Sequence, residues 1–253
     1  ATKTDIVTQL KKYNVASVRP EIIDPEITKL LLTSTIKFDA KSTTKTATTL
    51  RSEVLTTLTN YNTNTLTQFD GVFRYSKVTG LIDGTDNSIL SNITTLKIRK
   101  DFTPTLASST KYNVYFRNTL FNPHSGHNAA DGGILESSGF KISGDSSTVF
   151  FLDDDGQGNV RRYSFSGATR VYANETQGTI DYSTGAITLN SLSVLSVENI
   201  RGEASTKIEL TVVPSSNDVV PVRDQILEID TANSSITVTA DTFVGGSADA
   251  GVG

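Results

Sequence analysis

The sequence predicts an α+β protein in which a small mixed α/β region is followed by a β-rich antiparallel sandwich or open barrel. Residues 149–165 and 178–189 have the pattern of two β-hairpins, with turns at residues 153–159 and 183–185. Asp-Gly and Thr-Gly turns between β-branched or aromatic runs supply the positive φ angles that tight hairpins need. A helical pattern near residue 50 precedes these hairpins, so helix and sheet follow each other along the chain.

A short helix is predicted at the start of the chain. Its apolar residues fall on one helical face: Ile6, Val7 and Leu10. Asp5 favours a helix start at this point. Residues 17–23 are predicted to be extended, and Asp24 closes this segment because a residue before proline is pushed out of the α region.

A long strand and the clearest helix of the chain come next. The strand covers residues 27–39, and its imperfect alternation at residues 30–32 predicts burial on both faces there. The helix covers residues 43–60, where four apolar residues form one stripe at helical spacing: Leu50, Val54, Leu55 and Leu58. The many threonines weaken its intrinsic propensity, so we expect tertiary packing to stabilise it.

The first region ends with two short helices and a strand. Residues 66–84 predict a short helix or turn, a brief extended piece and a second short helix that ends near Gly84. A strand at residues 91–102 follows, with Ile93, Leu96 and Ile98 as its apolar residues. This order of elements is typical of a small sheet with helices on one face.

The rest of the chain is strand-rich. Residues 112–117 alternate well, and residues 122–139 read as a polar, glycine-rich loop. Further strands are predicted at residues 140–142, in the two hairpins, and at residues 193–197, 207–213, 226–229 and 236–240. We therefore expect a boundary near residues 102–110 and two regions, residues 1–104 and residues 105–253, the second ending in a flexible C-terminal tail.

Composition favours a structural protein over an enzyme. Hydrophobic residues make up 36% and charged residues 20% of the 253 residues, a mixture that suits half-buried strands. The formal net charge is −4 and no block of like charge stands out, so we expect neither a nucleic-acid partner nor a membrane partner. The absence of cysteine excludes disulfides and thiolate chemistry, and it indicates synthesis in a reducing cytoplasm.

The ends of the sequence predict that the chain is a fragment. It starts at Ala1, contains no Met and stops at Gly253 within a run of Gly and Ala. A complete gene product begins with Met unless it is processed. We therefore expect further sequence on at least one side.

The first hairpin turn has part of the pattern of a calcium loop. Oxygen-bearing side chains stand at alternate positions, with Gly158 in sixth place: Asp153, Asp155, Gln157 and Asn159. However, Ser164 occupies the twelfth position, where a bidentate Glu belongs, and the flanking segments are strands. We favour a plain, exposed hairpin turn in which Gly156 or Gly158 has a positive φ.

Other catalytic or metal-binding patterns are incomplete. His124 and His127 could place two imidazoles on one metal, but Ser125 and Gly126 between them indicate a loop, and a zinc-protease signature needs H-E-x-x-H. Residues 153–155 could supply one of the paired carboxylates of a glycosidase, yet the chain has no Trp for sugar stacking. No nucleophile elbow, P-loop or dinucleotide fingerprint is present. We expect no catalytic residue, no cofactor, no metal and no small-molecule substrate.

Two sets of motifs carry a family resemblance. The strings DDG-G-N and GTIDY-TG, at residues 153–159 and 178–185, resemble the baseplate wedge proteins of T-even-like phages, within the broader baseplate J-like family. The first region is similar to the C-terminal portion of baseplate J-like proteins in an ordered set of motifs: Asp24-Pro25-Glu26, residues 30–39, Phe73-Arg74-Tyr75-Ser76, residues 78–82 and residues 91–93. The resemblance covers most of the chain.

The resemblance implies a non-enzymatic building block of a contractile-tail baseplate wedge. Copies of such a subunit join into a ring around the tail hub, other wedge proteins dock on it, and the ring rearranges when the tail contracts. The implied protein is a late viral protein, made in the host cytoplasm and located in the virion. Two alternatives stay open: a tail-fibre or adhesin module that binds surface glycans, and, more weakly, a wall-degrading glycosidase.

One aromatic stretch is the candidate contact surface. Tyr112, Tyr115, Phe116 and Phe121 crowd beside the polar loop, together with Leu120. Alternation sends Tyr115 and Phe116 to opposite faces of a strand, so one of them needs cover, either within the fold or from another copy. Taken with the resemblance, this stretch predicts a homodimer formed through the C-terminal half. Replacing Phe116 with Asp is expected to dissociate it without changing the melting curve.

Overall fold

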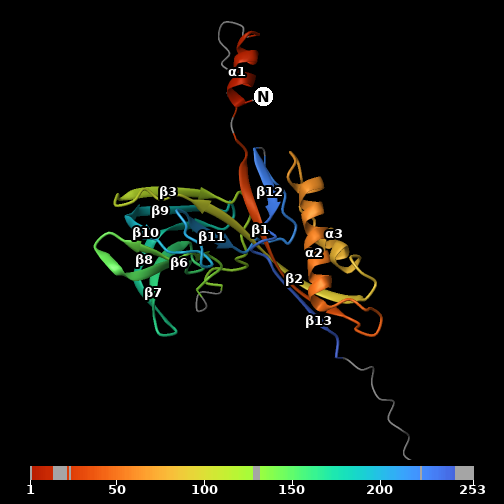
Figure 1. The fold of residues 1–253 in the computed structure, drawn as a ribbon. Coiled ribbons are helices and arrows are strands. Elements are labelled where there is room, and N and C mark those ends of the chain that lie inside the picture. Colours follow the sequence, from red (N-terminus) through yellow and green to blue (C-terminus); the bar gives the residue numbers. More distant parts are fainter. Residues whose placement is uncertain (1, 14–21, 23, 128–131, 223, 243–253) are drawn as a thin grey trace, which may run out of the picture.

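The structure is a computed structural model that describes residues 2–13, 22, 24–127, 132–222 and 224–242. Figure 1 shows two β-sheets side by side, one covered by helices and the other strongly curled. The predicted α+β class is therefore confirmed. The predicted extended segment at residues 17–23 and the predicted flexible tail lie almost entirely outside the described residues.

The first sheet is mixed, with the order β12-β1-β2-β11-β4 and with β13 also paired to β1. Its strands are β1 (Glu26–Phe38), β2 (Ile89–Phe102), β4 (Glu136–Ser137), β11 (Ile208–Val212), β12 (Gln225–Ile229) and β13 (Ser235–Ala240). β12 and β13 run parallel to β1, whereas β2 runs antiparallel to it. β1 thus lies between β2 on one side and the two C-terminal strands β12 and β13 on the other.

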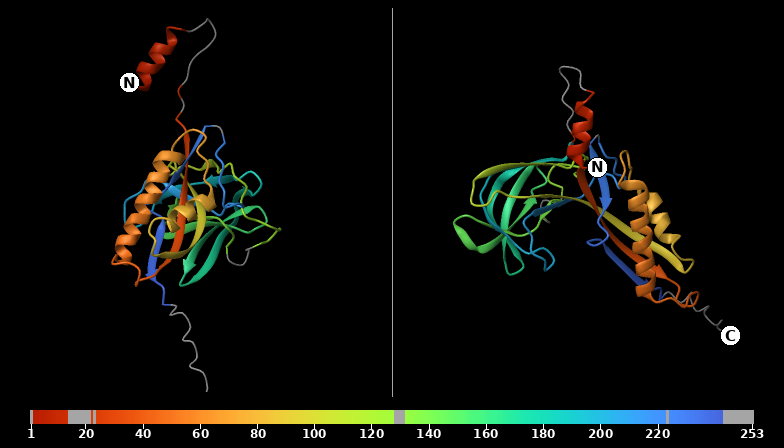
Figure 2. Two further views of the ribbon diagram at one scale, coloured as in Figure 1. Left: turned by 90° about the vertical axis from the view of Figure 1, so that its right-hand side faces the viewer. Right: turned by 45° about the horizontal axis from the view of Figure 1, so that its top comes forward.

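Two helices cover one face of this sheet, the face that points away from the curled sheet (Figures 1 and 2). They are α2 (Ala47–Tyr61), which continues into the π-helical turn η1 (Asn62–Leu66), and α3 (Tyr75–Asp83). α2 begins later than predicted because the Thr46 side chain accepts a hydrogen bond from the Thr49 N–H. Its buried stripe is Leu50, Val54, Leu58 and Tyr61.

Burial along the two long strands follows the pleat. Leu30 and Leu32 are completely buried, whereas Leu31 between them is only half-buried, so the predicted two-sided burial is wrong. In β2, Leu96 and Ile98 are buried, but Ile93 is 73% exposed because alternation places it on the face without helices. A sheet with helices on one face alone can leave part of its other face in water.

The predicted N-terminal helix is confirmed as α1 (Lys3–Lys11). Thr2 and Asp5 form a reciprocal capping box, in which each side chain accepts a hydrogen bond from the backbone N–H of the other residue. None of its residues is buried.

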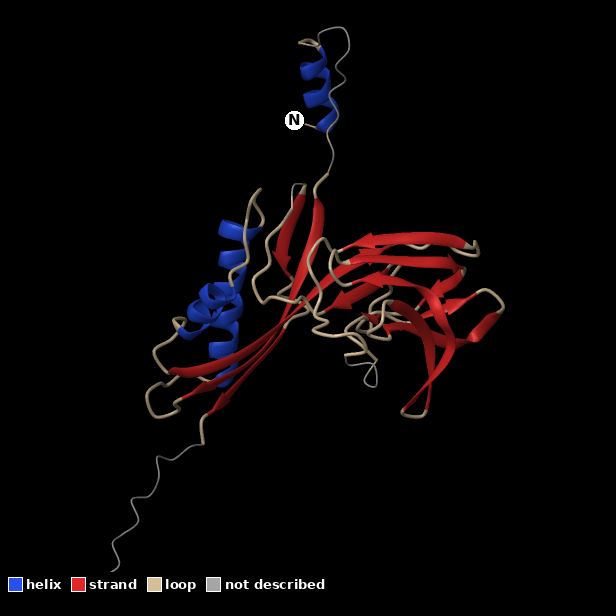
Figure 3. Cartoon of the chain, turned by 180° about the vertical axis from the view of Figure 1, so that it is seen from behind, coloured by secondary structure: helices blue, strands red, loops and turns tan. Residues whose placement is uncertain are grey.

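The second sheet has seven antiparallel strands in the order β10-β5-β6-β7-β8-β9-β3. They are β3 (Thr110–Tyr115), β5 (Phe140–Ile142), β6 (Asp145–Asp154), β7 (Asn159–Ser166), β8 (Thr169–Asp181), β9 (Ala186–Leu192) and β10 (Val194–Val197). Figure 3 shows this group curling on itself beside the first sheet. Both predicted hairpins are confirmed, with Asp154 opposite Val160 and Asp181 opposite Ala186.

Strand pairing does not follow the predicted boundary near residue 104. β11, β12 and β13 belong to the last fifth of the chain, yet they pair with β2 or β1 in the first sheet. The division into residues 1–104 and 105–253 therefore separates strands that share one sheet. A local pattern identifies a strand but does not identify a partner some 200 residues away.

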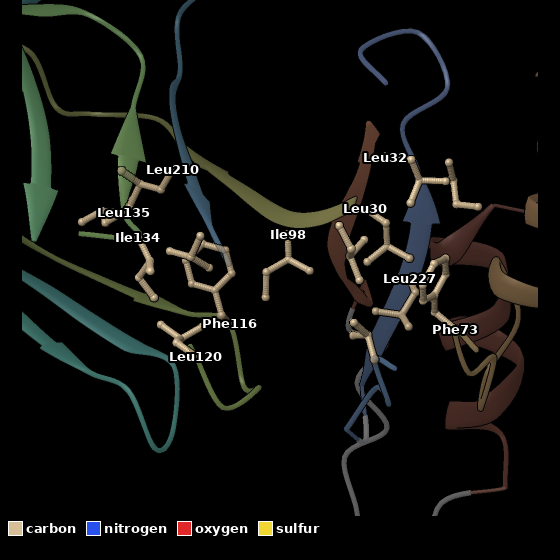
Figure 4. Packing of buried hydrophobic residues seen from close by; sticks show 14 of the residues in the cluster. Leu30, Leu32, Phe73, Ile98, Phe116, Leu120, Ile134, Leu135, Leu210 and Leu227 are labelled. Atoms are coloured by element: carbon tan, nitrogen blue, oxygen red, sulfur yellow. The ribbon is translucent and has the colours of Figure 1, made fainter. Parts of the chain in front are cut away.

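One hydrophobic core connects the two sheets. Figure 4 shows Phe116, Leu120, Ile134 and Leu210 gathered at the curled sheet, while Leu30 and Leu227 lie on the helix-bearing side. Ile98 of β2 lies between the two groups and is completely buried. Continuous packing of this kind predicts that the two sheets unfold together.

Candidate functional site

A groove of about 730 Å³ lies where β3 ends beside the turn between β8 and β9. Its lining residues are Tyr115, Arg117, Asn118, Thr119, Ser183, Thr184, Ala186 and Val222. The groove thus joins three stretches that are far apart in the sequence, and it includes one of the four predicted contact residues.

Backbone hydrogen bonds fix the walls of the groove. The Phe116 N–H donates to the Gly185 carbonyl at 2.8 Å, and the Leu120 N–H donates to the Tyr182 carbonyl at 2.7 Å. Gly185 has a φ of 69°, and a Cβ at this position would lie 2.4 Å from the Asn118 carbonyl oxygen. Only glycine therefore permits this close approach of the turn to the segment after β3.

The Asp181 side chain holds the turn that forms one wall. Its carboxylate accepts hydrogen bonds from the Ser183 N–H at 2.9 Å, the Ser183 hydroxyl at 2.6 Å and the Thr184 hydroxyl at 2.7 Å. These bonds, with the Ser183 hydroxyl contributing most, lower the pKa of Asp181 to about 2. The turn therefore stays ordered by an ionised carboxylate at neutral pH.

This depressed pKa predicts an acid-dependent loss of the turn. Because the ionised form is favoured in the folded state, Asp181 contributes stability above its ordinary pKa of 3.8, and the contribution is lost as the pH falls toward about 2. An NMR titration of the Asp181 carboxyl carbon is expected to give a midpoint near 2. A midpoint near the ordinary value would show that these hydrogen bonds do not persist in solution.

The groove combines exposed apolar side chains with a compensated charge. Tyr115 is 46% exposed and Val222 is 39% exposed. Arg117 has a φ of 55°, and its Nε lies 3.3 Å from a carboxylate oxygen of Glu26, which also pairs with Lys100. An open groove of this kind can receive a side chain or an extended segment of another protein, and it holds no paired acid and base for catalysis.

The four predicted contact residues do not share one environment. Tyr115 and Phe121 are 46% and 37% exposed, and the Phe121 ring also packs edge to face against His127. Tyr112 is half-buried, packs with its ring centre 4.9 Å from that of Phe102 in a tilted arrangement, and accepts a hydrogen bond on its hydroxyl from the Thr105 N–H. Phe116 is completely buried, so its expected role in a contact is wrong, and Phe116→Asp would disrupt the core. The alternation of Tyr115 and Phe116 is as predicted.

The Asp153–Asn159 turn is not the exposed tip that we expected. Asp153 and Asp154 are each 1% exposed. Asp154 Oδ1 accepts hydrogen bonds from the N–H groups of Ile134 and Leu135 at 2.6 and 2.7 Å, and Oδ2 accepts one from the Tyr182 hydroxyl at 2.6 Å. Burial, followed by this bond to Asp154, raises the pKa of Tyr182. Asp154 thus links the loop at Ile134 and Leu135 to Tyr182, which precedes the turn on the groove wall.

The neighbouring Asp153 carboxylate is also fully engaged. It accepts hydrogen bonds from Arg161 at 2.9 Å, Arg170 at 2.7 Å and the Tyr172 hydroxyl at 2.9 Å. Burial raises its pKa, and these three partners oppose the shift. Its oxygens are directed at two arginines and a tyrosine rather than at a metal site, which speaks against the calcium-loop interpretation. The predicted positive φ is confirmed at both Gly156 (70°) and Gly158 (108°).

The two histidines contact each other rather than a third ligand. His127 Nδ1 lies 3.0 Å from His124 Nε2, and the two rings meet edge to face. Within the described residues, no three His, Asp or Glu side chains lie close enough to share a metal ion. The structure therefore brings His124 and His127 together, as the sequence suggested, but places no third metal-ligating side chain beside them among the described residues.

Two parts of the groove could not be identified from the sequence. Val222 stands in a loop before β12, and Thr184 stands in a hairpin turn, so neither looks like a contact residue in isolation. An exposed valine beside Pro221 is the one local signal that could have marked this loop.

A comparison with known families matches one part of the chain, which lies outside the groove. Residues 30–101, which cover most of β1, the helices α2 and α3 and most of β2, match the family model of the baseplate structural protein gp6, C-terminal domain III. A comparison with curated proteins gave no match. No helix in the described part of the chain is long and apolar enough to cross a bilayer. Residues 30–101 are thus similar to the C-terminal domain III of the gp6 baseplate family, and the chain is a structural, non-enzymatic component of a phage tail baseplate.

Proposed function

We propose that the chain is a late virion protein of the baseplate wedge, and that copies of it assemble into a ring around the tail hub. In this proposal other wedge proteins dock on the ring, and the ring rearranges when the tail contracts. The family match of residues 30–101 supports the structural role, and the resemblance of the hairpin motifs extends it toward the wedge.

The groove face, defined as the surface formed by the lining residues of the groove, is the proposed contact between two copies. The observation that carries this proposal is the exposure of two apolar side chains in the groove lining, Tyr115 and Val222. Tyrosine is enriched at protein interfaces because its ring contributes apolar area while its hydroxyl stays hydrogen-bonded. A groove beside an exposed ring is self-complementary, as a two-fold contact requires.

Sedimentation equilibrium at several concentrations tests this contact. The wild-type chain is expected to shift from monomer to dimer as concentration rises, and Tyr115→Asp is expected to remain monomeric because it places a charge in the apolar contact. Phe165→Asp is the matched control, since Phe165 is 50% exposed on the distant β7–β8 hairpin. A wild-type chain that stays monomeric throughout, or equal loss in both variants, would count against the groove face.

A further inference from the structure

Two adjacent arginines of β7 face opposite sides of the curled sheet and have different partners. Arg161 Nε lies 2.9 Å from Asp153. Arg162 forms no ion pair with any described residue; its Nη1 donates to the Gln177 side-chain oxygen at 2.7 Å, and its guanidinium carbon lies 5.2 Å from the centre of the Phe150 ring. The positive charge of Arg162 is therefore met by a neutral amide and an aromatic ring.

Most other arginines among the described residues have a carboxylate partner, in contrast to Arg162. Six of them lie within 3.3 Å of a carboxylate oxygen: Arg74, Arg99, Arg117, Arg161, Arg170 and Arg201. Arg51, which forms no ion pair, is exposed and donates to the Ile236 carbonyl. Arg162 combines partial burial with the lack of a counter-ion.

The pairing of β7 with β8 is irregular at Arg162, and this irregularity affects the direction of its side chain. The pairing register of β7 and β8 shifts on both sides of Arg162, which faces Asn174, whereas Tyr163 faces Tyr172. Ala173 is therefore an extra residue in β8, which forms a β-bulge. Bulges bend a strand and redirect a side chain, and they are frequent next to binding sites.

The amides beside Arg162 are themselves held in place. The Gln177 side chain is 3% exposed, donates to the Asn190 carbonyl at 2.6 Å and accepts a second, longer hydrogen bond from Asn174 at 3.3 Å. Its oxygen is therefore fixed toward Arg162. This network orients the guanidinium but leaves its charge uncompensated, and Arg162 Nε is buried without an acceptor.

A half-buried guanidinium without a counter-ion reduces the stability of the isolated chain. Burial lowers the pKa of Arg162, as expected when a charge leaves water unpaired. A strand position that carries such a cost, next to a well-paired arginine, is typical of a residue retained for binding.

We propose that Arg162 is a binding site for a carboxylate, which reaches the Nη atoms of the guanidinium end-on. The planar guanidinium matches the two oxygens of a carboxylate, and the ammonium of lysine does not. The carboxylate belongs either to an acidic side chain of a docked protein or to a free small anion. This site is separate from the groove face and does not rest on the proposed self-association.

NMR titration of the Arg162 Nε–H resonance in the full chain tests the site. Sodium acetate is expected to shift this resonance saturably, while sodium chloride at the same ionic strength is not. A short glutamate-containing peptide that saturates the shift at a concentration about tenfold lower would assign the site to a protein side chain. Acetate and peptide acting at similar concentrations would assign it to a free carboxylate.

Two variants separate binding from a structural role. Arg162→Met keeps the apolar stem on Phe150 and is expected to melt no lower than the wild type, whereas the matched Arg161→Met is expected to melt lower because it leaves Asp153 short of a partner. The Gln177 side-chain amide resonance, which is present in both proteins, is expected to shift with acetate in the wild type and not in Arg162→Lys. A wild-type resonance that ignores both probes, or that moves equally with chloride, would overturn the proposal, as would an Arg162→Met variant as unstable as Arg161→Met.

Discussion

Asp154→Ala is expected to destabilise the protein by roughly 3–5 kcal/mol, because several buried donors lose the acceptor that they share. The side chain is 1% exposed and accepts hydrogen bonds from the N–H groups of Ile134 and Leu135 and from the Tyr182 hydroxyl. Alanine would leave these buried donors without an acceptor, and each unmet donor costs about 1–3 kcal/mol. Urea unfolding followed by circular dichroism measures the loss.

Asp155→Ala is the matched control in the same turn. Asp155 is only half-buried, and it accepts hydrogen bonds from the Gln157 and Asn159 N–H groups. Removal of the Asp155 carboxylate is expected to lower the free energy of unfolding by about 1 kcal/mol, because water can accept hydrogen bonds from the N–H groups that it leaves. If the two variants unfold at the same urea concentration, Asp154 does not hold the loop and the groove wall together as described.

Phe116→Ala is expected to cost about 3–5 kcal/mol, while Tyr115→Ala next to it is expected to change stability by less than about 1 kcal/mol. Phe116 is completely buried, and Figure 4 shows its ring among Leu120, Ile134 and Leu210. Removal of the ring opens a cavity that close-packed neighbours fill only partly. Tyr115 faces the groove, so its truncation removes contact area for a partner rather than core packing.

The same urea titration distinguishes these two residues. A Tyr115→Ala loss as large as that of Phe116→Ala would show that the ring of Tyr115 is also part of the core. It would then remove the main support for the groove face.

Local patterns were sufficient for most individual elements. The Thr-Gly turn before Ala186 and the apolar stripe from Leu50 to Leu58 each set a conformation through residues within a few positions of one another. Hairpin register follows from such turns, since the strand partners are adjacent in sequence. The two hairpins and α2 could therefore be predicted.

Features that depend on distant residues could not be predicted in the same way. The burial of Asp154 depends on N–H groups about 20 residues earlier, and the parallel pairing of β13 with β1 depends on a strand about 200 residues away. Three neighbouring aspartates in a turn normally indicate a solvated tip, because unpaired carboxylates are costly to bury. The arginines and amide groups that change this outcome come from other strands and loops. Phe116 was misassigned because alternation shows that two residues face opposite ways, not which of them faces the core.

Site-specific crosslinking tests the central claim, self-association through the groove face, most directly. The chain has no cysteine, so one introduced thiol reports on one position. Thr184 is exposed on the groove wall, and Thr33 is an exposed threonine on the face of the first sheet that has no helices. A thiol-specific crosslinker with a short spacer is expected to yield covalent dimers of Thr184→Cys and almost none of Thr33→Cys at the same concentration. Dimers of Thr33→Cys alone, or equal yields from both variants, would contradict the account.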